Sequence, residues 1–344
     1  MTTILNTLYV TAPQTYLRLE NEAVRVDIER EEKLRVPLHH LGTIVCFGNT
    51  LVSTALIHRL ADDGKPLVFL DDGGRFKARL EGPVSGNILL RQAQHRLALD
   101  RTFALPVARA IVAGKLRNSR HVLMRGARDA NSIDDERLLG KGADSLANAL
   151  ARVEHAPDLD TLRGIEGESA RVYFHAFPHL VRTDLRGVLA PQGRSRRPPR
   201  DRMNAVLSFL YSMLMNDCRS AVETVGLDPQ LGFLHAVRPG RAALALDLME
   251  ELRSVVADRL ALTLVNRGQL KPGDFVSREG GAVSLDPEAR KRVITAYQER
   301  KREDVSHPLL AERIPLALVP SVQARLLART VRGEVATYVP YLAR

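Results

Sequence analysis

One stretch of the sequence gathers residue types that could bind a metal ion. Residues 231–252 read LGFLHAVRPGRAALALDLMEEL, with a Pro-Gly turn at 239–240 and strong helix formers from Ala242 onward. The stretch contains one histidine and three acids, which are His235, Asp247, Glu250 and Glu251. On a helix, the two glutamates project within roughly 60° of Asp247, so these like charges need a nearby cation.

Two interpretations of this stretch remain open. Leu244, Leu248 and Leu252 recur at helical spacing and predict that the helix packs on a core, with at least one acid at the edge of that core. The simpler interpretation is an amphipathic helix with a solvated acidic face and a histidine bonded to a backbone carbonyl. The alternative is a metal site, because carboxylates suit Mg²⁺ or Mn²⁺ and one imidazole shifts the preference toward Mn²⁺.

A second candidate ligand lies in residues 160–177, which read DTLRGIEGESARVYFHAF. Glu166 is placed at the start of a predicted helix and continues the apolar face of that helix, whereas Glu168 points elsewhere. The face consists of Ala170, Tyr173, Phe174 and Phe177. An acid at this place could also simply favour the N-terminus of a helix, so the pattern alone leaves Glu166 a candidate.

The charge of the chain favours a polyanionic partner, for which nucleic acid is the usual choice. The chain has 50 Lys and Arg against 40 Asp and Glu, a net charge of +10. Residues 101–128 hold seven basic residues and no acid, a field of one sign that either contacts phosphate or is unused surface charge. A further basic cluster within residues 291–302 is interpreted as ordinary surface.

Residues 193–202, GRSRRPPRDR, form a segment rich in arginine. Its two prolines predict an exposed loop, since neither prolines nor unpaired arginines belong inside a helix. Guanidinium groups match the geometry of phosphate oxygens, so we expect this loop to bind DNA. The predicted DNA-binding residues are Arg194, Arg196, Arg197, Arg200 and Arg202.

The elements that must position these residues fall into two parts. From Ile4 to Leu80 the sequence alternates apolar and polar residues, as in TYLRLE and AVRVDIE, with one predicted helix from Val52 to Asp62. Turn residues gather at 82–86, and the pattern beyond them is helical. The predicted fold class is α+β, with a small β-rich N-terminal domain (1–85) and a larger, all-α-helical domain (86–344).

The composition also limits the class of protein. With 344 residues and 45% apolar content, the chain can bury a core, and no apolar run reaches the roughly 20 residues that span a bilayer. The two cysteines, Cys46 and Cys218, lie far apart, and no signal-peptide pattern is present. We therefore expect a reducing compartment, the cytoplasm.

Four ordered motifs resemble the CRISPR-associated integrase family Cas-one (Cas1), and more narrowly its type I-C branch. The match covers nearly the whole chain. The motifs are GRFKARLEGPVSGNILLRQAQ (74–94), GIEGESARVYF (164–174), RRPPRDRMNAVLSFLYSML (196–214) and VGLDPQLGFLHAVRPGRAALALDLMEELR (225–253). Ser254 departs from the proline of many members, which bears on the helix bend and leaves the ligands unaffected.

The resemblance implies a set of site residues. Glu166 of the IEG motif, His235 of the GFLH motif and Glu250 of the DLME motif match the family's metal ligands and catalytic residues. The expected cofactor is Mg²⁺ or Mn²⁺, and Asp247 is expected to support the ligands without being one of them. Glu251 does not align with a ligand, and we expect it to be a surface residue whose replacement costs little stability.

The resemblance also implies an activity and partners. Family members insert short DNA fragments into a CRISPR array, where the 3′-hydroxyl ends of the fragment attack the repeat. The implied partners are DNA, a second copy of the chain in a homodimer, a Cas-two (Cas2) dimer that bridges two such dimers, and a Cas-four (Cas4) nuclease. The resemblance assigns dimerisation to the N-terminal domain (1–85) and catalysis, with metal and DNA binding, to the helical domain (86–344). The alternatives are a stand-alone metal-dependent repair nuclease acting on branched DNA and a non-catalytic DNA-binding scaffold.

Overall fold

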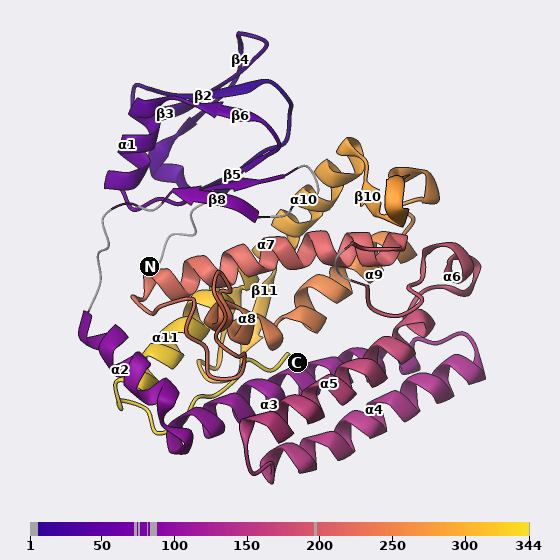
Figure 1. The fold of residues 1–344 in the computed structure, drawn as a ribbon. Helices are drawn as coiled ribbons and strands as arrows, with labels where there is room; N and C mark the ends of the chain where they lie inside the picture. Colours follow the sequence, from indigo (N-terminus) through magenta and orange to yellow (C-terminus); the bar gives the residue numbers. More distant parts are fainter. Residues whose placement is uncertain are drawn as a thin grey trace. The chain divides into compact units, whose positions relative to one another are not determined.

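The computed structural model describes residues 6–71, 74, 76–80, 82, 88–195 and 198–343. The chain divides into two compact units, Met1–Ser85 and Gly86–Arg344. Figure 1 shows that the first unit is built mainly of strands and the second mainly of helices. The predicted α+β fold class, a β-rich part followed by a helical part, is confirmed.

In its described residues, the N-terminal unit contains two four-stranded sheets, one α-helix and a short 3-10 helix at Leu38–His40. The elements are β1 (Asn6–Val10), β2 (Thr15–Glu20), β3 (Ala23–Ile28), β4 (Glu31–Pro37), β5 (Leu41–Phe47), β6 (Thr50–Val52), α1 (Thr54–Asp62), β7 (Leu67–Leu70) and β8 (Phe76–Leu80). One sheet has the order β1-β5-β7-β8, with β5 parallel to both β1 and β7. The other has the order β4-β3-β2-β6, antiparallel except for the parallel pair of β2 and β6.

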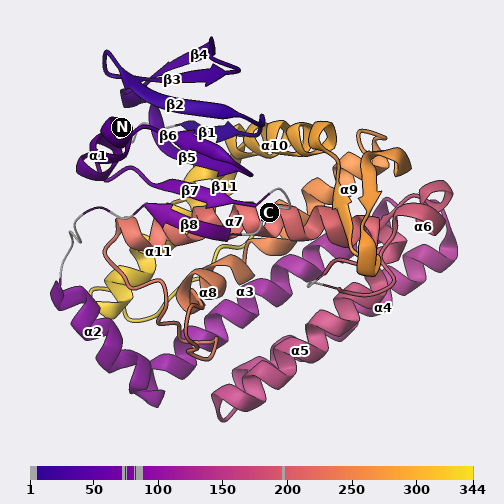
Figure 2. The ribbon, with the colours of Figure 1, turned by 45° about the horizontal axis from the view of Figure 1, so that its top comes forward.

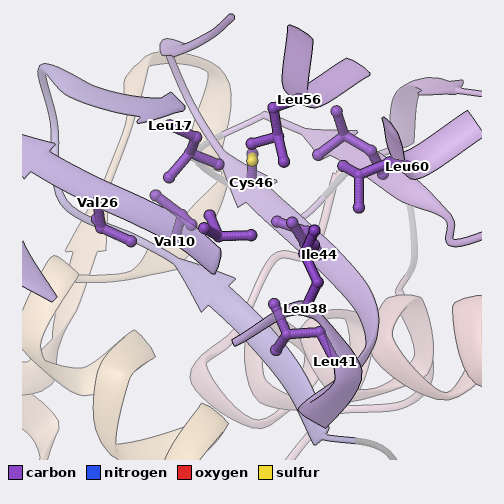
Figure 3. Packing of buried hydrophobic residues seen from close by; sticks show 11 residues of the cluster. Val10, Leu17, Val26, Leu38, Leu41, Ile44, Cys46, Leu56 and Leu60 are labelled. Carbon is purple, nitrogen blue, oxygen red and sulfur yellow. The ribbon is translucent and has the colours of Figure 1, made fainter. Parts of the chain in front are cut away.

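The core of this unit forms where apolar side chains of the strands meet those of α1, as Figure 3 shows for Leu17, Ile44 and Leu56. Ser53 ends the strand β6 and begins α1, because its hydroxyl accepts a hydrogen bond from Leu56 N at 3.3 Å. The helix therefore starts after the predicted Val52. Cys46 lies in this core, where burial raises the pKa of its thiol to about 12, so it is an unreactive apolar side chain.

The second unit is largely helical. Its helices are α2 (Ile88–Leu99), α3 (Arg101–Arg128), α4 (Ile133–Glu154), α5 (Leu159–Ala176), α6 (Thr183–Leu189), α7 (Arg202–Thr224), α8 (Ala243–Glu250), α9 (Arg259–Asn266), α10 (Pro287–Arg302) and α11 (Val319–Val331). The long helices α3, α4 and α5 lie side by side in both Figure 1 and Figure 2. Several helices begin at an acid or serine whose side chain accepts a backbone N–H, and these caps are Asp100, Ser132, Asp158, Asp201 and Asp286.

Two features of this unit differ from the sequence prediction. It is not purely helical, because β9 (Phe275–Ser277) pairs with β10 (Val283–Leu285) and β11 (Asp304–His307) pairs with β12 (Glu312–Pro315). The predicted helix from Ala242 is also interrupted, since α8 ends at Glu250 and a π-helical segment follows at Arg253–Asp258. Such π-helical turns often occur at functional sites. Among the described residues, no helix has both the length and the apolar character to cross a bilayer.

Candidate active site

Two of the predicted ligands, from separate helices, meet at a lysine. Glu166 lies within α5, not at its start, and Glu250 is the last residue of α8. The ammonium of Lys115 on α3 contacts Glu166 Oε1 and lies 2.7 Å from Glu250 Oε2. Lys115 belongs to the basic segment noted in the sequence, but nothing in that pattern distinguishes it from its six basic neighbours.

The third predicted ligand, His235, faces Glu250. Its Nε2 lies 3.7 Å from Glu250 Oε1, and its Nδ1 lies 2.6 Å from Asp247 Oδ1. Asp247 already accepts hydrogen bonds from backbone N–H groups, so it is the acceptor here and Nδ1 carries the proton. The Nε2 lone pair is therefore left on the side of Glu250, and a metal-binding histidine needs such a free nitrogen.

Asp247 fixes the loop that carries His235. Its side chain is fully buried and accepts the backbone N–H groups of Phe233 at 2.6 Å, Leu234 at 2.9 Å and His235 at 2.9 Å. Gly232 makes this approach possible, because a Cβ there would lie 2.5 Å from Asp247 Oδ2 and 2.9 Å from the Ala243 carbonyl carbon. The GFLH motif thus supplies a tight loop whose N–H groups surround one carboxylate.

Positive groups surround the Glu250 side chain, which is only 2% exposed. Arg253 Nη2 lies 3.0 Å from Glu250 Oε1, and its guanidinium lies over the Tyr211 ring at 5.2 Å. Burial alone would raise the pKa of Glu250, but the charges of Arg253 and Lys115 lower this pKa well below its ordinary value. Glu250 is therefore a carboxylate at neutral pH.

The donor set fits a hard divalent cation, although its side chains are spread around the lysine. Within the part of the chain that the structure describes, no three His, Cys, Asp or Glu side chains lie together closely enough to hold a metal ion. Two carboxylates and one imidazole are nevertheless the ligand types for Mg²⁺ or Mn²⁺. Among the described residues, no group donates a hydrogen bond of good geometry to Glu250 Oε2, although this oxygen forms an ion pair with Lys115. That buried oxygen can accept a cation.

The prediction that Glu251 is a surface residue is wrong. Glu251 is fully buried and turned away from Lys115, with its carboxylate accepting hydrogen bonds from Tyr338 Oη at 2.7 Å, Gln323 Nε2 at 3.1 Å and Tyr341 N at 2.7 Å. Asn118 of α3 donates to the carbonyls of Glu251 and Tyr341. The segment from Tyr338 to Ala343, here called the C-terminal segment, is therefore bound to the end of α8.

Another buried acid, Asp258, lines a largely apolar cavity beside the site. Asp258 accepts hydrogen bonds from Tyr211 Oη at 2.7 Å and Tyr173 Oη at 3.0 Å. The cavity is also lined by Lys115 and Arg253. Burial raises the pKa of Asp258 to about 6, against the opposing effect of the two tyrosine hydrogen bonds.

We expect Asp258→Asn to make the protein more stable at high pH. The pKa of Asp258 is raised to about 6 in the folded protein from 3.8. The protonated Asp258 side chain therefore stabilises the folded state fully below about pH 3.8, and this stability is lost as the pH rises through about 6. Asn stays neutral and can still pair with both hydroxyls, so the variant should gain up to roughly 3 kcal/mol at pH 8 and progressively less toward pH 4. Urea unfolding across this range measures the difference. Asp144→Asn, an exposed acid on α4, is the control, and a gain that does not depend on pH would contradict the assignment.

The arginine-rich segment is only partly exposed, in contrast to its prediction as an exposed loop. Arg194 is half-buried and donates to Asn204 Oδ1 at 2.7 Å, with its guanidinium 5.1 Å from the Tyr211 ring centre. It therefore supports the fold around the site. Arg202 is half-buried and donates to Val188 O at 3.1 Å, whereas the Arg200 side chain is exposed. Arg196 and Arg197 lie outside the described residues.

The other basic clusters are partly engaged within the protein. On α3, Arg109 donates to the carbonyl of Ala156 at 2.6 Å. On α10, the interpretation of the cluster as ordinary surface agrees with its ion pairs, which are Lys291 with Glu288, Arg292 with Asp274, Arg300 with Glu303 and Lys301 with Asp217.

Solved structures share this fold. A CAS1 protein from Thermotoga maritima aligns with a TM-score of 0.82 over 96% of this chain and 97% of its own, at 22% sequence identity. A casposase bound to an integration product aligns with a TM-score of 0.82 over 97% of this chain and 93% of its own, at 20% identity. A chain of a Cas6-RT-Cas1–Cas2 complex aligns with a TM-score of 0.85 and 22% identity, over all of this chain and 37% of its own.

Sequence relatives are more similar. A CRISPR-associated endonuclease Cas1 of Moorella thermoacetica is 54% identical over 341 residues, and one of Rhodospirillum rubrum is 50% identical over 345 residues, each covering 99% of both chains. A Cas4/Cas1 fusion of Geobacter sulfurreducens is 36% identical over 98% of this chain and 60% of its own. The family model for CRISPR associated protein Cas1 matches residues 8–299. The chain belongs to the Cas1 family.

Proposed function

We propose that the protein is a metal-dependent DNA endonuclease and integrase of CRISPR adaptation. It inserts short foreign DNA fragments into the CRISPR array, where their 3′-hydroxyl ends attack the repeat. The proposal is supported by the contacts of Glu166 and Glu250 with Lys115 and of His235 with Glu250, in a chain half-identical to endonucleases of this family.

We propose Glu166, His235 and Glu250 as the ligands of one Mg²⁺ or Mn²⁺ ion. A cation of this kind lowers the pKa of an attacking hydroxyl and stabilises the charge that develops on the phosphate. Asp247 contributes by holding the His235 tautomer and loop, since a misplaced imidazole could not share a ligand shell with Glu250.

The side chains of the protein align the reacting groups and place positive charge beside them. Transesterification at phosphorus exchanges one 3′-oxygen for another, so the protein needs to align the groups and need not form a covalent intermediate. Arg253 and Lys115 place two cations beside Glu250, where a phosphate approaching the site would meet them in a partly desolvated environment. If water takes the place of the hydroxyl, the same site cuts DNA.

We also propose partners for the protein, namely DNA and other CRISPR-associated proteins. DNA contacts would use exposed basic residues such as Arg200, with Arg196 and Arg197 of the same loop, and would be mainly to phosphate. We further propose a homodimer, a Cas2 dimer bridging two such dimers, a Cas4 nuclease and a cytoplasmic location, in a type I-C system. Support comes from the likeness to a chain of a Cas6-RT-Cas1–Cas2 complex and from the Cas4/Cas1 fusion among the relatives.

The test of the proposal is Glu166→Ala. We expect this variant to lose Mn²⁺-dependent joining of a labelled fragment to a repeat-bearing plasmid by at least about 10³-fold, while it still binds DNA. Glu168→Ala, on the same helix but exposed and paired with Arg152, is the control and should stay active. Cutting without any joined product in the wild type would favour a repair nuclease, and activity unchanged in folded Glu166→Ala would favour a scaffold whose acids are only structural.

A further inference from the structure

The Lys115 ammonium occupies a central position among the site acids. It contacts carboxylates of two helices, Glu166 Oε1 on α5 and Glu250 Oε2 on α8, the latter at 2.7 Å. The Lys115 side chain is 12% exposed and that of Glu250 is 2% exposed, so water screens this contact weakly. Lys115 therefore occupies one oxygen of each carboxylate, between the two groups that a shared cation would also have to contact.

An ammonium and a divalent cation cannot both occupy this position, because their charges repel strongly at contact distance in a site with little water. We propose that Lys115 is a built-in competitor for these carboxylates, which a divalent cation must displace, and that the displaced ammonium then pairs with the phosphate of bound DNA. The inference rests on the proposed metal and DNA sites.

The chemistry of the two neighbouring cations explains why Lys115 and not Arg253 would move. Lysine is a point charge on a flexible four-carbon stem, and it can exchange one anionic partner for another. Arg253 is held more firmly, since its guanidinium lies over the Tyr211 ring at 5.2 Å and bonds to the other oxygen of Glu250 at 3.0 Å.

This exchange couples the binding of the metal to the binding of DNA. DNA phosphate that attracts Lys115 frees the carboxylates for the metal, and metal that displaces Lys115 frees its charge for phosphate. By linkage, each ligand must then raise the affinity for the other by the same factor. The metal would consequently bind well only when a DNA substrate is in place.

The experiment compares Mn²⁺ affinity of the wild type and Lys115→Met, with and without a short duplex whose 3′-deoxy ends cannot react. Free Mn²⁺ is followed by electron paramagnetic resonance, and a titration of DNA alone corrects for Mn²⁺ bound to the duplex. Without DNA, the variant should bind Mn²⁺ at least about tenfold more tightly than the wild type. Adding DNA should tighten Mn²⁺ binding about tenfold in the wild type and much less in the variant.

Controls separate this inference from the proposed function. Lys141→Met, an exposed lysine on α4, should behave as the wild type. If the wild type binds no Mn²⁺ in either condition, the metal site itself is wrong. If the wild type binds Mn²⁺ and loses it in Glu166→Ala, but Lys115→Met binds it equally or more weakly, the metal site stands and the competition is overturned.

A measurement on the wild type covers the case in which Lys115→Met does not fold. Saturating Mn²⁺ should increase the rate of acetylation of Lys115 by an amine-reactive reagent, measured by peptide mass spectrometry with Lys141 as the internal reference. An unchanged labelling rate at saturating Mn²⁺ would overturn the proposal.

Discussion

Glu250→Ala is expected to abolish strand joining, with a loss on the order of 10³-fold or more. Glu250 is the acid that connects the site, because Lys115 and Arg253 contact its two oxygens and His235 Nε2 lies 3.7 Å away. Without it, a cation would be left with Glu166 and His235, and the attacking hydroxyl would lose its alignment. Joining of a labelled fragment to a repeat-bearing plasmid across a Mn²⁺ titration measures the effect.

Because Glu250 is buried among cations, its removal could also disturb the fold. Glu250→Gln keeps the shape of the side chain and removes only its charge, so it should fold and still fail to join DNA. Circular dichroism checks the fold of both variants. Full joining activity in either folded variant would show that Glu250 is not part of the reacting site.

Glu251→Ala is expected to destabilise the protein by about 3 kcal/mol or more. The substitution removes the buried acceptor of Tyr338 Oη and Tyr341 N, and each buried donor that loses its partner costs roughly 1–3 kcal/mol, whereas Gln323 Nε2 keeps its bond to Val339 O. Urea unfolding at pH 7, followed by circular dichroism, gives the change in the free energy of unfolding.

Glu299→Ala, an exposed acid on α10, provides the control and should change the free energy of unfolding by less than about 0.5 kcal/mol. If Glu251→Ala lowered the free energy of unfolding by no more than the control does, the hydrogen bonds to the C-terminal segment would contribute little. We thus expect replacement of Glu250 to affect mainly the joining activity and replacement of Glu251 to affect mainly the stability of the fold.

The comparison of Glu250 and Glu251 shows what the sequence could predict. Motif matching selected Glu250, and helical geometry indicated that its neighbour points about 100° away. That direction leads into the protein, because residues about 90 positions later, Tyr338 and Tyr341, cover it. Local periodicity carries no information about such distant partners.

The division of the fold was predictable for a local reason. Alternation with period two before residue 82 and helical spacing after residue 87 are properties of short windows, and they fix the two types of unit. The roles of single cations were not predictable. Lys115 and Arg194 look like their basic neighbours in sequence, and only the folded chain brings Lys115 to two carboxylates and Arg194 to an aromatic ring.

The binding of the C-terminal segment to Glu251 sets an order of events during synthesis. Tyr341 is made 90 residues after Glu251, a delay of roughly 5–20 s at ordinary rates of translation. Until then, the buried face of α8 lacks the partners that hold its end against α3 at Asn118. A growing chain therefore gains the partners of Glu251 only after Tyr341 has been made, so chains released before that point should contain Glu250 without a firmly held end of α8.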